Sequence, residues 1–510
     1  MACLRSSLGV SLASLLVLLA CQGRGSEDDE VGEGESGSET AGESETETAG
    51  EELLVDVAIE LHPNQPMVVD VHVQLSEPGF VTLTHLEDPG VKVARLDGEG
   101  PATDIWLRVR GLAPDTLHAL ELGVGTGEGA ASEVHPVELT TNPPLPGYIE
   151  SFPLTLDVPA EVDDDYRFFD LSHYFAAGSP SLFMIDKTGR TRWHYGVDVD
   201  FVYLNEMWVG LKLREDGSVL ALRTDAALIY DELGEELMRV EAEQFDLTYF
   251  HHEIIELPSG NFMTLTFSFQ DVEYEGEGLL PVAGDRLLEF TPAGELVWTW
   301  DTFDHLDPQR RRDGFYGSAP IINPETRENA YDWTHANGML YRDGVIYVSF
   351  RHQDWILAIE HATGEILWKL GDEGDFALGP DSTWFFHQHS PEWQPDGSLL
   401  MYDNAVGNPD QEDSAAHSRA VRYVLDMEGM VATQVWQDDD AKFVSSIAGD
   451  ADRTSLGHVL RLDSTMGGVM VYSRLRELVP DRTPNAVWSL DLPPGMFAYR
   501  AVPTPRLVGE

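Results

Sequence analysis

The stretch that decides the fold is DWTHANGMLYRDGVIYVSFRHQD, residues 332–354. Its centre predicts an apolar β-hairpin, in which GMLY and VIYVSF are the strands and the chain turns at Asp343. His335 lies eight residues before Asp343 and Arg351 eight residues after it, so an antiparallel ladder would pair the two positions. We therefore expect His335, Asn337 and Arg351 to meet at one end of this hairpin.

Similar hairpins recur from about residue 146 onward. One kind consists of a strand, a glycine turn and a second strand that often ends on Trp, as in LEFTPAGELVWTW and LAIEHATGEILWKL. Its turn glycines are Gly189, Gly234, Gly294, Gly364 and Gly429. A second kind interleaves with the first, as in LPSGNFMTLTF, QPDGSLLMYD and MGGVMVYS. Two hairpins per period make a four-stranded blade, so we predict an all-β chain with a six-bladed β-propeller at 146–510, although the pattern also allows five or seven blades.

A different pattern precedes the propeller. Between 53 and 145, short segments such as MVVDVHVQL and DIWLRVRGL alternate apolar and polar residues and are separated by turn residues. This predicts a small β-sandwich domain. The segment LRVRGLAPDTLHALELGV resembles a strand-loop-strand feature of fibronectin type III domains, so we expect a sandwich of that kind that acts as a spacer or support.

The N-terminus has the features of an export signal. Residues 1–20 contain one basic residue, Arg5, followed by the apolar run LGVSLASLLVLLA, which is too short to span a bilayer. The run ends in Leu-Leu-Ala-Cys21, which resembles a bacterial lipobox and implies cleavage before Cys21 and lipid attachment to its sulfur. Gln22 is not the aspartate associated with inner-membrane retention, so we expect an exported lipoprotein in the periplasm or at the cell surface, anchored in the outer membrane.

Residues 21–52 are rich in Glu, Gly and Ser and have almost no apolar side chains, which predicts a disordered acidic linker. The whole chain has 510 residues and a formal net charge of −57. Such a field repels nucleic acids and anionic membrane surfaces, so we exclude a nucleic-acid partner and expect membrane contact only through the N-terminal lipid. An anionic substrate would need positive charge within its own site.

Three of the inner hairpins begin with a histidine. His252 and His389 each lie six residues before the proline that opens the turn, and His335 lies one residue farther from its own turn. The innermost strands of a propeller line its channel, so we expect the three imidazoles to converge at one channel mouth. A histidine cluster can also bind zinc or copper, but no HExxH motif or carboxylate-rich loop accompanies this one, and we predict no metal and no cofactor.

Several segments together resemble one family. The stretches FHHEIIELPSGN (250–261), DWTHANGMLYRDGVIYVSFRHQDWILAIEHATGEILWKLGD (332–372) and HQHSPEWQPDGSLLMYDN (387–404) are similar to the bacterial arylsulfate sulfotransferases, as is SRAVRYVLD (418–426). The resemblance covers about 245–440 strongly, and the layout of 53–510 matches as well. It implies a small N-terminal β-domain, a six-bladed propeller, and transfer of a sulfuryl group from one phenol to another through a sulfated channel histidine, without a nucleotide donor.

The resemblance also implies roles for individual residues. The nucleophile falls on His389, and the assisting groups fall on His252, His335, Asn337 and Arg351. The partners would then be an aryl sulfate donor and a phenolic acceptor. This chain departs from some members in having no cysteine near the nucleophile, and Phe350 stands where a small residue often does.

The residue types suit this chemistry. Sulfuryl transfer resembles phosphoryl transfer, with charge spread over equatorial oxygens, so the planar guanidinium of Arg351 is well suited to bind them. Asp403 lies about as far beyond the turn at Asp396 as His389 lies before it, and we expect it either to orient His389 or to be a surface residue. Aromatic residues precede the histidines and are candidates for binding the aryl ring, although core packing is the alternative. They are Tyr249, Trp333 and Phe386.

Two other functions remain open on the residues alone. The segment IEHATGEILWKL resembles the tryptophan-docking repeat of quinoprotein dehydrogenases, but those usually have eight blades and often a vicinal cysteine pair, which is absent here. The other alternative is a propeller that binds a surface and catalyses nothing. The natural donor and acceptor and the oligomeric state, a homodimer included, stay open.

Overall fold

The computed structural model describes most of the chain from residue 52 onward. The described ranges are 52–129, 131–173, 180–196, 208–312, 321–326, 328–409, 411, 417–438, 443–467 and 470–510. The expected signal peptide (1–20), the lipidation site Cys21 and nearly all of the acidic linker (21–52) lie outside the described residues. Within those residues, no helix has the length and apolar character needed to cross a bilayer.

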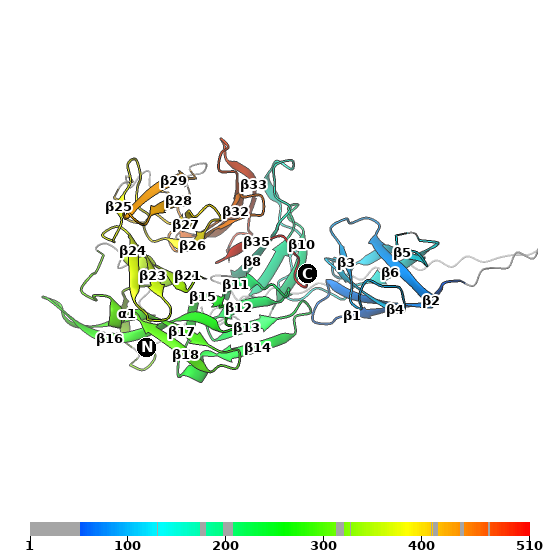
Figure 1. The fold of residues 1–510 in the computed structure, drawn as a ribbon, viewed down its shortest axis with the longest axis horizontal. Coiled ribbons are helices and arrows are strands. Elements are labelled where there is room, and N and C mark those ends of the chain that lie inside the picture. The colour runs from blue at the N-terminus through cyan, green and yellow to red at the C-terminus, as the bar shows by residue number, and fades with distance from the viewer. Residues whose placement is uncertain are drawn as a thin grey trace, which may run out of the picture. The chain divides into compact units, whose positions relative to one another are not determined.

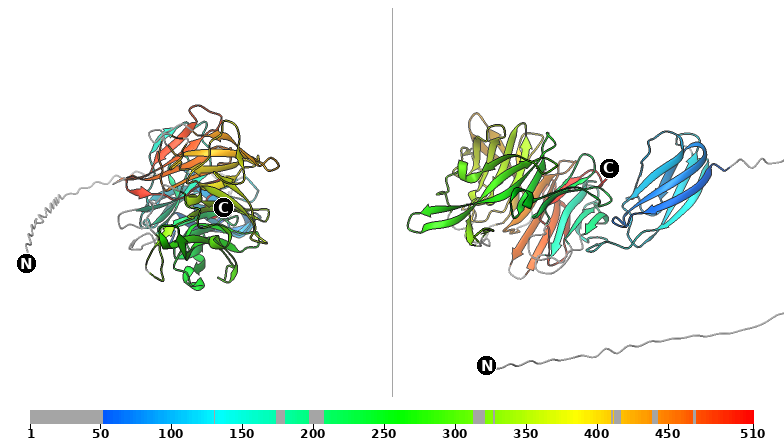
Figure 2. Two further views of the ribbon diagram at one scale, coloured as in Figure 1. Left: turned by 90° about the vertical axis from the view of Figure 1, so that its left-hand side faces the viewer. Right: turned by 90° about the horizontal axis from the view of Figure 1, so that it is seen from below.

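The first strands form a two-layered β structure. The long strand β2 (Val68–His85) pairs with β1 and β4 along its first half and with β5 along its second, so the chain passes from one layer to the other within a single strand. Figure 2 shows these strands in blue to cyan. Their inward-facing valines and leucines form one buried cluster. The other strands are β1 (Leu54–Leu61), β3 (Lys92–Arg95), β4 (Ala102–Arg110), β5 (Leu117–Gly125) and β6 (Glu133–Thr140).

The rest of the described chain forms six further sheets (Figure 1). The first contains β8 (Tyr166–His173), β9 (Ser181–Ile185), β10 (Thr191–Gly196), β34 (Met496–Phe497) and β35 (Ala501–Thr504). The second contains β11 (Trp208–Leu213), β12 (Val219–Arg223), β13 (Ala226–Tyr230) and β14 (Glu236–Glu241). The third contains β15 (Phe250–Glu256), β16 (Phe262–Tyr274), β17 (Gly278–Phe290), β18 (Leu296–Asp301), β19 (Ile321–Ile322) and β20 (Asn329–Asp332).

The remaining three sheets follow in chain order. The fourth contains β21 (Ala336–Arg342), β22 (Val345–Phe350), β23 (Trp355–Glu360) and β24 (Ile366–Gly371). The fifth contains β25 (Ala377–Leu378), β26 (His389–Trp393), β27 (Leu399–Asp403), β28 (Arg419–Asp426) and β29 (Val431–Gln437). The sixth contains β30 (Ala448–Arg453), β31 (Val459–Gly467), β32 (Met470–Leu478), β33 (Ala486–Asp491) and β7 (Leu154–Asp157). The described helices are short: η1 (Ala242–Phe245), α1 (Thr302–His305) and η2 (Arg351–Gln353).

The sheets follow one another around a closed ring. The innermost strands contact their neighbours in the order β11, β15, β21, β26, β30 and β35, and β35 in turn contacts β11. The C-terminal strand β35 closes the ring by pairing with β8, and β7 from the start of this region is the outermost strand of the sixth sheet. This is the arrangement of a β-propeller, in which the innermost strands surround a central channel.

The repeated turn glycines have the backbone conformation that the pattern requires. Gly189, Gly234, Gly294 and Gly364 all have φ between 74° and 81°, a conformation that costs a residue with a side chain about 1 kcal/mol or more. At the fifth turn the left-handed position falls on Met430 (φ 48°) instead. In the sixth sheet the inner hairpin is β30–β31 with its turn at Gly457, whereas we had expected it at MGGVMVYS.

The hairpin at 332–354 brings His335 opposite Arg351 as expected, although its ladder shifts by one residue between Ala336 and Gly338. The ladder of β21 and β22 pairs Ala336 with Phe350, and the backbone N–H of Arg351 donates to the carbonyl oxygen of His335 at 3.0 Å. Ile346, Val348 and Phe350 lie on the face of this hairpin that packs against the third sheet, and all three are fully buried there. Burial of these apolar side chains helps to fix the register, because a shift by one residue would move all three to the opposite face of the sheet.

Candidate active site

Each of the three histidines lies where an innermost strand is irregular. The ladder register shifts between His251 and Ile254 in β15 and between His389 and Glu392 in β26. His252 has φ 61° and His335 has φ 51°. A residue other than glycine in this left-handed conformation costs on the order of 1–3 kcal/mol, and such residues concentrate at functional sites. A β-bulge also changes the direction in which its side chains point.

The five residues expected in the site lie together. The rings of His252 and His335 are 4.7 Å apart between centroids. Asn337 donates from Nδ2 to the carbonyl oxygen of Gln388 at 2.8 Å, which holds the backbone directly before His389. The guanidinium of Arg351 acts electrostatically on His389, and both side chains are almost completely buried. The contact of Asn337 is therefore to the backbone beside His389.

His389 is held in one tautomer. Its Nδ1 is 2.6 Å from Oδ1 of Asn404, and Nδ2 of Asn404 donates to the carbonyl oxygens of Ser445 (2.8 Å) and Ala448 (2.9 Å). The amide therefore presents its oxygen to the imidazole, and Nδ1 of His389 carries the proton. The lone pair is then on Nε2, which is buried and has no hydrogen-bond partner among the described residues.

The surroundings of His389 also keep it neutral. Burial lowers the pKa of His389 well below the ordinary value of 6.5, and the positive charges of Arg351 and Arg500 lower it further. A neutral imidazole with a buried lone pair on Nε2 is suited to attack an electrophile.

Asp403 does not make the contact that we expected. Its carboxylate accepts from the backbone N–H groups of Phe386 and Ala405 and pairs with Nε of Arg419 at 2.9 Å. The residue that orients His389 is its neighbour Asn404. The reason is the bulge in β26, because the ladder pairs His389 with Tyr402, and counting outward from the turn is then wrong by one residue.

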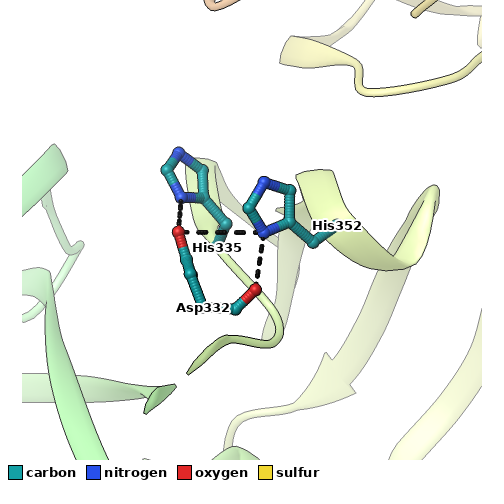
Figure 3. Close-up of side chains that lie close together, drawn as sticks. All are labelled: Asp332, His335 and His352. Atoms are coloured by element: carbon teal, nitrogen blue, oxygen red, sulfur yellow. Dashed lines mark hydrogen bonds and ion pairs between the residues drawn. The ribbon is translucent and has the colours of Figure 1, made fainter. Parts of the chain in front are cut away.

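Asp332, which the sequence pattern does not indicate, orients two histidines through its carboxylate and its main-chain oxygen. Oδ2 of Asp332 is 2.5 Å from Nδ1 of His335, and the main-chain oxygen of Asp332 accepts from Nδ1 of His352 at 2.8 Å. Figure 3 shows both rings on the same side of Asp332, with their Nδ1 atoms toward it. Nε2 of His352 accepts from Nη1 of Arg351 at 2.6 Å, so Asp332 also helps to position Arg351.

Asp332, His335 and His352 also form a group in which one potential metal-ligand atom of each lies within 4.8 Å of the others. The hydrogen bonds just described occupy both Nδ1 atoms, and an ion bound there would have to displace them. We therefore interpret the group as Asp332 orienting two imidazoles, His335 through its carboxylate and His352 through its main-chain oxygen.

His252 is supported by the adjacent residue of its own strand, β15. Its Nδ1 is 2.9 Å from Nδ1 of His251, whose Nε2 lies 3.2 Å from Oδ1 of Asp285. Burial, followed by the charges of His335 and His251, lowers the pKa of His252 well below 6.5.

The three aromatic candidates differ in position. Trp333 is buried in the core, where its Nε1 donates to the carbonyl oxygen of Arg310 at 3.0 Å. Phe386 is also buried, in the apolar cluster of the fifth sheet. Tyr249 lines a cavity of about 380 Å³ together with Phe267 and other residues, and its hydroxyl donates to the carbonyl oxygen of Ile322. Of the three, Tyr249 alone borders a described cavity.

The C-terminal segment contributes two residues that the sequence reading missed, Tyr499 and Arg500. Arg500 donates to the main-chain oxygen of Asn337 at 2.8 Å, to Glu253 at 3.2 Å and to the hydroxyl of Ser390. Tyr499 lies between His252 and His389, with ring centroids 5.6 and 6.4 Å away. Nothing near these positions in the sequence indicates this, because they reach the site only through ring closure by β35.

Arg500 also borders the larger of the two described cavities. This cavity has a volume of about 520 Å³ and is lined by Glu253, Ser390, Arg500 and by residues farther along β21 and β26 than the histidines. The guanidinium of Arg500 therefore lies between the histidine cluster and this cavity.

Several solved structures match the chain at low sequence identity and low TM-score. A protein of unknown function from Dyadobacter fermentans is 10% identical, with a TM-score of 0.31 over 68% of this chain and 88% of its own. A putative gluconolactonase is 12% identical, with a TM-score of 0.27 over 70% of this chain and 97% of its own. Apo AztD from Citrobacter koseri is 8% identical, with a TM-score of 0.26 over 76% of this chain and 95% of its own.

No curated protein matches the chain. The family model described as Arylsulfotransferase (ASST) matches residues 159–479, which is more than half of the chain and includes all five residues expected in the site. The chain belongs to the arylsulfotransferase family.

Proposed function

We propose that this protein transfers a sulfuryl group from an aryl sulfate ester to a phenolic acceptor, through a transient N-sulfo group on Nε2 of His389. Membership of the arylsulfotransferase family supports a sulfotransferase enzyme. The observation that carries the mechanism is the state of His389: its Nδ1 is bound to Asn404, and its Nε2 is buried without a partner among the described residues.

The proposed reaction has two displacements. In the first, the lone pair on Nε2 of His389 attacks sulfur, the bond between sulfur and the aryl oxygen breaks, and its electron pair leaves with that oxygen. In the second, the oxygen of the acceptor phenol attacks sulfur and the N–S bond breaks, returning the lone pair to Nε2. The donor phenol leaves before the acceptor binds, so the kinetics should be ping-pong.

His335 and His252 handle the proton. A protonated imidazole gives its proton to the departing phenolate, and the neutral imidazole then takes the proton of the incoming phenol. Asp332 binds Nδ1 of His335 and so orients its ring, as a carboxylate does in a catalytic triad. The negative charge of the bound aryl sulfate favours the protonated form of a histidine beside it.

Arg351 supplies fixed positive charge for the sulfuryl oxygens. Burial in a medium of low dielectric makes its attraction for an anion stronger than at a surface. Its bonds to His352 and to the carbonyl oxygen of Ser446 hold the guanidinium in place. In a chain of net charge −57, this local charge offsets the repulsion that an anionic donor would meet.

The function is tested by mixing the protein with 4-nitrophenyl sulfate and phenol. We expect release of nitrophenolate together with phenyl sulfate, and parallel lines in double-reciprocal plots when both substrates are varied. Nitrophenolate released with inorganic sulfate as the main product would indicate a hydrolase instead. Failure to turn over any of a panel of aryl sulfates would favour a binding role.

The pH dependence follows from the lowered pKa of His389. Only the neutral imidazole attacks, and His389 becomes protonated only at a pH below its lowered pKa, so the acid limb of kcat/KM should lie below pH 6.5. The check is a pH–rate profile between pH 4 and 8 with 4-nitrophenyl sulfate, whose sulfate remains ionised throughout. A midpoint at or above 6.5 would contradict the proposed environment of the nucleophile.

We also propose the finer architecture. The six sheets in a ring support a six-bladed propeller within 146–510, and the strands β1–β6 support a fibronectin-type-III-like sandwich within 53–145. We further propose that residues 1–20 are a signal peptide, that Cys21 is lipidated and anchors the protein in the outer membrane, and that 21–52 is a linker. Mass spectrometry of the mature N-terminus, compared between the wild type and Cys21→Ser, tests the anchor.

A further inference from the structure

The hydroxyl of Tyr499 is a buried polar group that the mechanism above does not use. Tyr499 is 6% exposed, and its hydroxyl has no hydrogen-bond partner among the described residues. An unsatisfied buried hydroxyl costs on the order of 1–3 kcal/mol, so such a group in a native structure calls for an explanation. A phenylalanine would pack the same space without that cost.

Hydrogen bonds of the backbone hold the ring of Tyr499 in position. The N–H groups of Tyr499 and Arg500 both donate to the carboxylate of Asp170 in β8, at 2.7 to 3.0 Å. Asp170 is itself buried, so these bonds are shielded from water. The guanidinium carbon of Arg500 lies 4.9 Å from the centroid of the Tyr499 ring and limits its movement on that side.

The ring lies between groups that belong to the proposed reaction. His252 is on one side and His389 on another, at the centroid distances given above, and the charge of Arg351 also reaches the hydroxyl. Burial raises the pKa of Tyr499, so the hydroxyl keeps its proton and can donate it in a hydrogen bond. An acceptor oxygen of a ligand between His252 and His389 would satisfy it.

We infer that the Tyr499 hydroxyl donates a hydrogen bond to a non-bridging oxygen of the sulfuryl group while that group moves to and from His389. Tyr499 is then a further catalytic residue. It transfers no proton, and it works with Arg351 by stabilising charge on the equatorial oxygens. This inference rests on the proposed function.

The test is Tyr499→Phe in the full chain, which removes the hydroxyl and keeps the ring. We expect kcat/KM for 4-nitrophenyl sulfate to fall about 10- to 100-fold, the range for a lost hydrogen bond to a charged group. Both half-reactions should slow, because the sulfuryl oxygens are present in each. The loss should be the same for aryl sulfates whose phenols differ in acidity, whereas a proton donor to the leaving group would matter more for the less acidic phenols.

Tyr230→Phe is the matched control, since Tyr230 is a buried tyrosine of the second sheet, away from the histidines. It should leave kcat/KM within about twofold of the wild type. Equal activity of Tyr499→Phe and the wild type in both half-reactions would overturn the inference. So would a loss that increases as the leaving phenol becomes less acidic.

Binding of inorganic sulfate, measured by calorimetry, separates this inference from the proposed function. If the wild type transfers no sulfuryl group but binds sulfate at least fivefold more tightly than Tyr499→Phe, the proposed function fails and the hydroxyl remains an anion ligand. If the wild type is inactive and both proteins bind sulfate equally or not at all, both proposals fail.

Discussion

His389→Ala is expected to lower sulfuryl transfer at least about 10⁴-fold, because removal of a covalent nucleophile leaves only the contributions of binding and charge stabilisation. The measurement is release of nitrophenolate with phenol as the acceptor. A second measurement is made without acceptor: wild-type protein mixed with an aryl sulfate should retain a sulfuryl group on the peptide that contains His389, seen by mild mass spectrometry. The variant should retain none.

His361→Ala is the control for loss of a histidine elsewhere. His361 pairs with Glu289 outside the cluster, so this variant should keep near-wild-type activity and form the adduct. An adduct on the peptide that contains His252 would move the nucleophile to β15. Full activity of His389→Ala, with no adduct anywhere, would favour direct transfer between two bound phenols.

Arg351→Ala should lower kcat/KM by about 10²- to 10³-fold, which corresponds to about 2–4 kcal/mol, the range for removal of an oxyanion-hole donor. Arg351→Lys should restore little of this, since an ammonium group does not reproduce the planar array of N–H donors. Steady-state kinetics with 4-nitrophenyl sulfate measures both variants. Near-wild-type turnover in Arg351→Ala would assign Arg351 a structural role.

A second readout separates charge from packing. Arg351 is the first of the two charges that lower the pKa of His389, so its removal should raise that pKa and shift the acid limb of kcat/KM upward. Loss of the bonds from Arg351 to His352 and Ser446 would reduce stability without moving the limb. A slower enzyme with an unchanged acid limb would therefore argue against an electrostatic role.

Much of the site could be predicted because its residues lie near the same end of the innermost strand in each of the hairpins. Alternation of apolar residues and the turn at Asp343 decide how β21 and β22 pair, and this brings Arg351 to His335. The same reasoning applied to the other inner hairpins selects His252 and His389. These are local consequences of strand period and turn position, so no knowledge of the rest of the fold is needed.

Local reasoning is wrong where the strand is irregular. Counting from the turn places Asp403 opposite His389, but the bulge in β26 pairs His389 with Tyr402 instead, and the imidazole contacts Asn404. Trp333 and Phe386 were candidates for substrate contact, yet packing between neighbouring sheets buries both in the core. An aromatic residue near a site has the same sequence pattern whether its side chain contacts a substrate or packs in the core.

The sequence by itself determined the hairpins, their turns and the histidines at their ends, because these depend on the two-residue period of a strand and on glycine at positive φ. Only the tertiary structure decided which groups hold the histidines and which residues complete the site. Tyr499 and Arg500 lie 110 or more residues from every histidine of the cluster and reach it because β35 closes the ring against β8. Contacts between distant segments depend on how all the sheets pack, and no local pattern encodes that.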